Sequence, residues 1–176
     1  MAWHPGKPDK LADIIVALGL VESLGIPFTM EPPLHPFYSW DGTQFWFSER
    51  DAEEICHDVA HWLMASETWR QLPEFGLGSS NWDEAKEPDE HLQPRINECH
   101  EEAMVSILGL ILFSYLGGTD DYLKFQFHYQ SWHDADPSKD LAEILPKCPI
   151  DVSVHAERIC SLWNEWKRNW SFEKRY

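Results

Sequence analysis

A long apolar segment in the second half of the chain is the feature that most constrains the fold. Residues 103–113 are apolar except for Ser106, and Gly117 and Gly118 follow shortly afterwards. A helix that is apolar on every side must be surrounded by other elements, and glycine is a common residue at a helix stop. The apolar run to Leu116 is shorter than the roughly 20 residues needed to cross a bilayer. We therefore expect a central buried helix in a domain that does not span a membrane.

The remaining periodicity also favours helices. Apolar positions recur at helical spacing over residues 9–25 and over residues 152–170. Ser48 is the predicted N-cap of a third helix, which extends to about residue 66. Residues 44–47 predict a short strand, whereas residues 122–127 fit either a strand or a helix. We expect a mainly α fold with a few short strands, in which residues 1–176 form a single compact helix-dominated domain.

The charge of the chain excludes some classes of partner. Thirty acidic and fourteen basic residues give a formal net charge of −16. Such a surface repels the phosphates of nucleic acids and anionic lipids, so neither nucleic acid nor membrane is an expected partner. The four cysteines show no C-x-x-C spacing, and no signal peptide is recognisable. These features predict a cytoplasmic protein.

A histidine pair on the helix predicted from Ser48 to about residue 66 is the first candidate for a functional site. Residues 57–62 read His-Asp-Val-Ala-His-Trp, which places His57 and His61 four residues apart. On a helix, such residues project from one face, one turn above the other. Both imidazoles are therefore able to reach a single metal ion.

A second cluster, of carboxylates, precedes the apolar segment. An acidic and polar loop is expected over residues 76–97, and Glu98, Glu101 and Glu102 then open the central helix. Partly buried carboxylates need cations, hydrogen-bond donors or a metal. Glu98 shares a helix face with Glu101 and Glu102, three and four residues later, and one of these carboxylates is expected to reach the same point as the histidines. The expected metal site therefore lies between two long helices. The alternative is a solvated first turn, which the helix dipole favours for acidic residues.

Two histidines and one carboxylate are the ligand set of non-haem Fe(II) oxygenases and of several zinc hydrolases. His-Asp-x-x-His is one methylene shorter than the His-Glu-x-x-His of zinc peptidases, in which the Glu is the general base. A zinc hydrolase with Asp58 near the bound water is therefore one alternative. A non-enzymatic, acidic, Trp-rich binding protein is another.

These residues resemble those of the elongation factor P hydroxylases. Residues 57–62 match the His-Glu-x-x-His-Trp of that family except at Asp58. Residues 69–76 are similar to a family segment that ends in Asp-Phe-Gly, and Glu98 with Glu101 matches a Glu-x-x-Glu pair. The likeness covers roughly residues 10–165, and its specific part is about 45–110.

The resemblance implies a helix-dominated non-haem iron enzyme that hydroxylates a modified lysine on a translation factor. Carried over, the metal ligands are His57, His61 and Glu101. Glu98 orients a ligand imidazole or the bound water, and Asp58 serves that purpose or positions the substrate. Fe(II) is the expected metal, zinc is the alternative, and the expected partner is a protein substrate.

Overall fold

The computed structural model describes residues 10–32, 39–48, 50–76, 98–130 and 136–173. These residues form a helix-dominated domain with two very short strands, as the periodicity predicts. The elements are α1 (Lys10–Ser23), β1 (Phe28–Thr29), β2 (Phe45–Trp46), α2 (Ala52–Met64), α3 (Glu67–Arg70), the 3-10 turn η1 (Pro73–Gly76), α4 (Glu98–Tyr115), α5 (Asp120–Gln130), α6 (Pro137–Ile144), the 3-10 turn η3 (Leu145–Lys147) and α7 (Ser153–Glu173).

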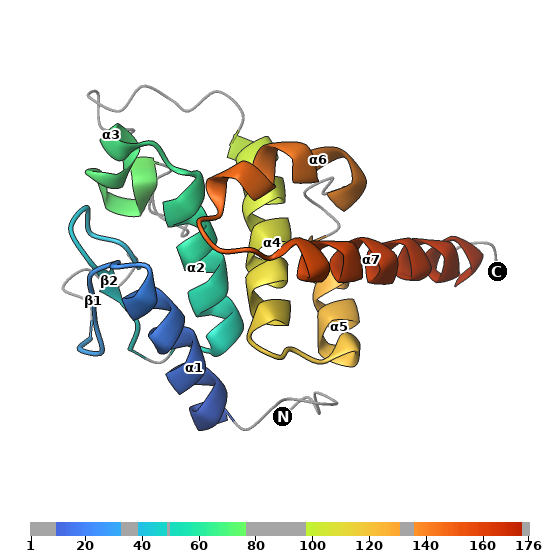
Figure 1. The fold of residues 1–176 in the computed structure, drawn as a ribbon, viewed down its shortest axis with the longest axis horizontal. Coiled ribbons are helices and arrows are strands. Elements are labelled where there is room, and N and C mark those ends of the chain that lie inside the picture. Colours follow the sequence, from blue (N-terminus) through green and yellow to red (C-terminus); the bar gives the residue numbers. More distant parts are fainter. Residues whose placement is uncertain (1–9, 33–38, 49, 77–97, 131–135, 174–176) are drawn as a thin grey trace.

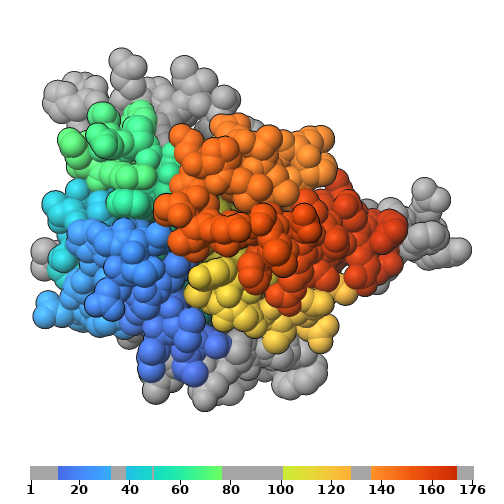
Figure 2. Space-filling view, viewed as in Figure 1, coloured from blue at the N-terminus to red at the C-terminus, as the bar shows by residue number. Residues whose placement is uncertain are grey.

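Helix α4 lies at the centre of the domain, which confirms the prediction from its apolar sequence. Every residue from Ala103 to Ser114 is buried. Helix α2 packs along one side of α4, α5 and α7 pack on the other, and α1 lies against the outer side of α2 (Figure 1). In the space-filling view, α6 and α7 cover most of α4 on this face (Figure 2). Among the described helices, none combines the length and apolarity needed to span a membrane.

Helices α2 and α4 approach each other closely where a glycine removes the side chain. A Cβ atom at Gly109 would lie 3.0 Å from the Cα atom of His57 and 3.3 Å from its backbone nitrogen. A glycine inside a helix costs about 1 kcal/mol relative to alanine. Here the missing side chain allows the backbone of α2 to sit directly against α4.

The two short strands, β1 and β2, pair in parallel. Phe28 is opposite Phe45 and Thr29 is opposite Trp46. The expected strand at residues 44–47 is thus confirmed for Phe45–Trp46, whereas β1 was not anticipated in a proline-rich segment. The Asp41 side chain closes the turn before β2 by accepting hydrogen bonds from Thr43, Gln44 and Trp46. Burial raises the pKa of Asp41, but these hydrogen bonds outweigh it and hold the pKa below its usual value.

The start and the end of α2 differ from the expectation. The N-cap is Asp51 and not Ser48, because Glu54 accepts a hydrogen bond from the Asp51 N–H at 2.7 Å and so completes a capping box. The helix ends at Met64 because Ala65 adopts an extended conformation, with ψ 141°.

The ambiguous segment around residues 122–127 is helical and belongs to α5. Its buried positions are Tyr122, Leu123, Gln126 and Phe127, a spacing that fits one face of a helix. Helix α6 was not anticipated, although Asp136 as N-cap followed by Pro137 is a recognised helix start. The expected loop over residues 76–97 lies outside the described residues from residue 77 onwards.

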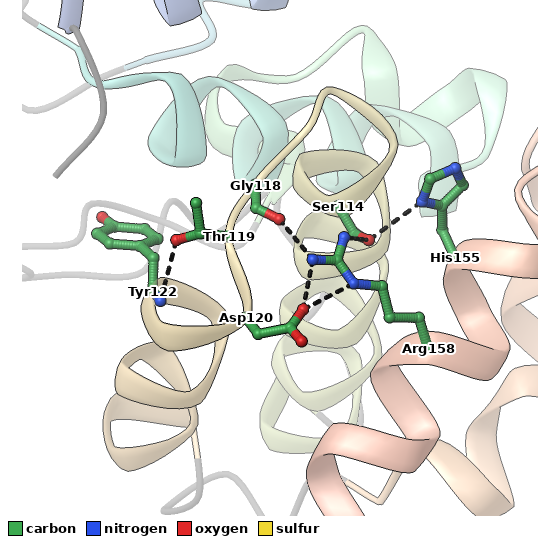
Figure 3. Close-up of polar contacts among 7 residues, drawn as sticks. All are labelled: Ser114, Gly118, Thr119, Asp120, Tyr122, His155 and Arg158. Carbon is green, nitrogen blue, oxygen red and sulfur yellow. Dashed lines mark hydrogen bonds and ion pairs between the residues drawn. The ribbon is translucent and has the colours of Figure 1, made fainter. Parts of the chain in front are cut away.

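A polar cluster fastens α7 to the junction of α4 and α5 (Figure 3). Arg158 donates hydrogen bonds to the carbonyl of Gly118 at 2.9 Å and to the hydroxyl of Ser114 at 2.8 Å, and it forms an ion pair with Asp120. His155 Nδ1 lies 3.1 Å from the same Ser114 hydroxyl. Ser114 is twelve residues after Glu102, so this cluster lies about 18 Å along α4 from Glu102.

The close approach of α2 and α4 at Gly109 predicts that a larger residue there destabilises the protein. Gly109→Ala should lower the free energy of unfolding by about 1–3 kcal/mol, because the methyl group must push the α2 backbone away from α4. Gly19→Ala in α1 is the matched control. A Cβ atom there has no described atom within 4 Å, so that variant should gain about 0.4–1 kcal/mol. Urea unfolding of both variants checks this, and an unchanged or increased stability of Gly109→Ala would contradict it.

Candidate metal centre

Two imidazoles from α2 and one carboxylate from α4 converge at the interface of these helices. His61 Nε2 lies 3.2 Å from Glu102 Oε1, and His57 Nε2 lies 3.6 Å from Glu102 Oε2. The three side chains each offer one ligand atom, and these atoms all lie within 4.8 Å of one another. Ligands of one metal ion at about 2.0–2.2 Å are themselves about 3.0–3.5 Å apart. The group therefore has nearly the spacing of a metal-binding triad.

The pair His57 and His61 is the part of the site that the sequence predicts. Their ring centroids are 4.9 Å apart with the planes at 80°, as expected for residues one helical turn apart. His61 is buried, with 8% of its surface exposed, whereas His57 is partly exposed. One imidazole is therefore held inside the protein, and the other lies at the edge of a cavity described below.

The third member of the group is Glu102, whereas the sequence favours Glu101. Adjacent helical residues point about 100° apart, so only one of the two is able to face α2. Glu102 shares its face of α4 with Ser106 and Gly109, four and seven residues later, and Gly109 touches His57. Glu98 belongs to the first turn of α4, but its side chain, and with it the predicted orienting role, lies outside the described residues.

The electrostatics of the triad favour an ionised carboxylate. Burial raises the pKa of Glu102, but hydrogen bonds from His57 and His61 and their charges outweigh it and place the pKa far below its usual value. Burial lowers the pKa of His57, yet Glu102 more than compensates, so the net shift is upwards. A metal ion would replace the proton that His57 shares with Glu102.

Cys56 is close in sequence but does not join the group. Its side chain is fully buried, and burial, with a smaller contribution from Glu53, raises the pKa of the thiol far above its usual value. The thiolate is the form that binds metals. Cys56 is therefore a core residue.

A polar cavity of about 220 Å³ adjoins the triad and shares His57 with it. The cavity lies between the first turns of α2, the middle of α4 and α5. It is lined by Arg50, Glu53, Glu54, His57, Asp58, Ser106, Gly109, Leu110 and Gln126. Three of these side chains are carboxyl groups and one is a guanidinium, so the lining favours a cationic ligand.

Asp58, a predicted catalytic residue, lines this cavity. Only 8% of its surface is exposed, and its Oδ2 atom has no hydrogen-bond partner within the described part of the chain. Burial raises the pKa of Asp58, and the nearby charges of Arg50, His57 and His61 offset this only in part. A buried carboxyl with a raised pKa beside a cavity is typical of acid–base groups.

The turn η1, after α3, also contacts the candidate site. The sequence did not predict this contact. Phe75 is buried and stacks on His61, with centroids 5.7 Å apart and planes at 12°. Glu74 and Phe75 adopt positive φ values of 47° and 55°, which cost about 1–2 kcal/mol per residue. Residues 69–76 resemble a segment of the elongation factor P hydroxylases, but the residue types at positions 74 and 75 do not predict positive φ values.

Glu74 holds this loop against residues 39 and 40. Its Oε1 atom accepts hydrogen bonds from the backbone N–H groups of Ser39 and Trp40, both at 2.7 Å. Burial, with the charge of Asp58, raises the pKa of Glu74 to about 7, although the hydrogen bonds act in the opposite direction. Glu74 therefore titrates near neutral pH.

Comparisons with protein-family models, with curated proteins and with solved structures find no match for this chain.

The raised pKa of Glu74 predicts a pH-dependent stability. A carboxyl whose pKa is higher in the folded state stabilises the fold below its unfolded pKa, and this contribution disappears as the pH rises through the folded pKa. Between about pH 4.5 and pH 8 the wild type should lose about 3 kcal/mol relative to Glu74→Gln, which cannot ionise. Urea unfolding of both proteins across this range measures the difference. Parallel pH profiles for the two proteins would disprove the assignment.

Proposed function

We propose that this protein is a non-haem Fe(II) enzyme that hydroxylates a side chain of another protein. The observation that carries the proposal is the convergence of His57, His61 and Glu102 at the edge of an acid-lined cavity. Two neutral imidazoles and one carboxylate leave coordination positions open on an iron ion. When bound, Fe(II) supplies the activation of O₂, and the chain supplies the ligands and the surroundings.

Different residues of the chain hold the metal and shield it from water. His57 and His61 present Nε2 atoms to the same carboxylate, so the three ligand atoms are gathered before a metal arrives. The apolar packing of α4 beneath Glu102 and the ring of Phe75 over His61 keep water from one side of the centre. Pre-gathered ligands reduce the ordering that metal binding would otherwise require.

The cavity supports a lysine-derived side chain as the substrate. Glu53, Glu54 and Asp58 attract an ammonium group, and the cavity shares His57 with the candidate metal centre. The overall charge of −16 also favours a partner segment that carries positive charge. Both features agree with the modified lysine of a translation factor, which the family resemblance implies.

A zinc hydrolase that uses the same three ligands is the second candidate. The observation in its favour is Asp58, whose buried carboxyl with a raised pKa lies beside the cavity. A group of this kind is suited to take a proton from a water molecule. The two candidates share the metal centre and differ in the metal and in the need for O₂.

Metal binding by matched variants tests the centre. We expect anaerobically purified wild-type protein to bind one Fe(II) per chain, and Glu102→Gln or His61→Ala to bind about 100-fold more weakly or not at all. Glu101→Gln is the control, since Glu101 adjoins Glu102 but is not in the triad; its affinity should stay within about threefold of wild type. Titration calorimetry measures these affinities. Equal binding by Glu102→Gln and wild type would refute the proposed centre.

Mass spectrometry of the substrate tests the reaction. Supplied with O₂ and an added two-electron reductant, the Fe(II)-loaded protein should insert one atom of labelled O₂ into a C–H bond of a lysine-derived side chain of the translation factor, and the second oxygen atom should leave as water. Asp58→Asn should slow this reaction if Asp58 positions the substrate. Activity with zinc that proceeds without O₂ would instead establish the hydrolase and overturn the hydroxylase.

A further inference from the structure

The ring plane of His61 is fixed by packing. A histidine that binds a metal usually donates its second ring N–H to a carbonyl or a carboxylate, which sets the orientation of the ring. His61 Nδ1 is buried, and it has no hydrogen-bond partner anywhere in the described residues. In the metal-free protein Nε2 meets Glu102 Oε1 at 3.2 Å, a contact that a bound metal ion would take over. Because the second torsion angle of a histidine side chain is soft, a further contact is needed to hold the ring plane once Nε2 binds a metal.

That contact is a stack of three rings. The ring of Phe75 lies between Trp40 and His61, with centroid separations of 5.6 Å and 5.7 Å and interplanar angles of 9° and 12°. Trp40 is itself fixed, because its indole N–H donates a hydrogen bond to the carbonyl of Arg70 at 2.8 Å. The imidazole of His61 therefore rests against a platform that is anchored on its far side.

The backbone around Phe75 is shaped to hold the ring in this stack. Glu74, Phe75 and Gly76 all have positive φ values, which is unusual for the first two. The N–H of Glu74 donates a hydrogen bond to the carbonyl of Trp40 at 2.9 Å, and the Glu74 carboxylate accepts hydrogen bonds from the backbone N–H groups of Ser39 and Trp40. Such strained conformations persist where the surrounding structure over-determines them, and they cluster at functional sites.

We propose that Phe75 is a positioning residue for the metal centre: its ring sets the plane of His61 so that Nε2 faces the metal position shared with His57 and Glu102. The inference rests on the proposed metal-binding function. In this arrangement the stack takes the place of a hydrogen bond at His61 Nδ1, for which the described residues offer no partner. The turn at residues 74–76 therefore serves the centre although none of its side chains offers a ligand to the triad.

Metal titration of Phe75→Leu tests the proposal. Loss of the ring should weaken Co(II) and Fe(II) binding by about tenfold or more, the size of effect seen when groups that orient a ligand are removed. The visible absorption of bound Co(II) should also change, because the direction of the His61 ligand changes. Phe113→Leu is the control for lost core volume, since Phe113 is equally buried but lies near the other end of α4; its affinity should stay within about threefold of wild type.

A metal-free measurement on the wild type covers the case in which Phe75→Leu does not fold. NMR signals of the carbon-bound ring protons of His61 should lie upfield, since the His61 ring stacks on the Phe75 ring. Unshifted signals would overturn the proposal. Phe75→Met, which fills the space without a ring, provides a second variant for the titration.

The outcomes distinguish the two proposals. If the wild type binds no metal, the proposed function fails. If the wild type binds metal and Phe75→Leu binds it equally well with an unchanged Co(II) spectrum, only the positioning role of Phe75 fails.

Discussion

The contact between α2 and α4 is the constraint on which the candidate site depends. At Gly109 the two backbones touch, so His57 is held against α4 and Glu102 lies within reach of both imidazoles. Glu102 is partly buried, and it directly precedes the stretch of α4 from Ala103 to Ser114 that is buried throughout. A carboxylate in such a place is stable only with a partner of opposite charge. His57, whose pKa Glu102 raises, or a metal ion bound by the triad provides it.

The same region departs from what stability alone would favour. Asp58 is buried with a raised pKa, Glu74 titrates near neutrality, and two non-glycine residues adopt positive φ values. Each feature costs free energy, and these residues lie on α2 and on the turn that packs against His61. Natural proteins break local rules of this kind mainly at functional sites. The concentration of such costs therefore supports a chemical role for this interface.

The sequence predicts the parts of the site that depend on local periodicity. The four-residue spacing of His57 and His61 predicts that they share one helix face, and the apolar sequence of α4 predicts a buried helix. The structure shows both. The choice between Glu101 and Glu102 is not local, because it depends on the rotation of α4 relative to α2. The contact of Phe75 with His61 was not predictable for a similar reason: it arises from a turn with positive φ values at Glu74 and Phe75, which neither residue type favours.

X-ray absorption spectroscopy of the iron-loaded protein tests the central claim most directly. The account predicts two imidazole ligands at about 2.1 Å together with oxygen ligands, and no sulfur ligand at about 2.3 Å. A spectrum with one imidazole or none, or with a sulfur ligand, would contradict the assignment of His57, His61 and Glu102 as a shared metal centre.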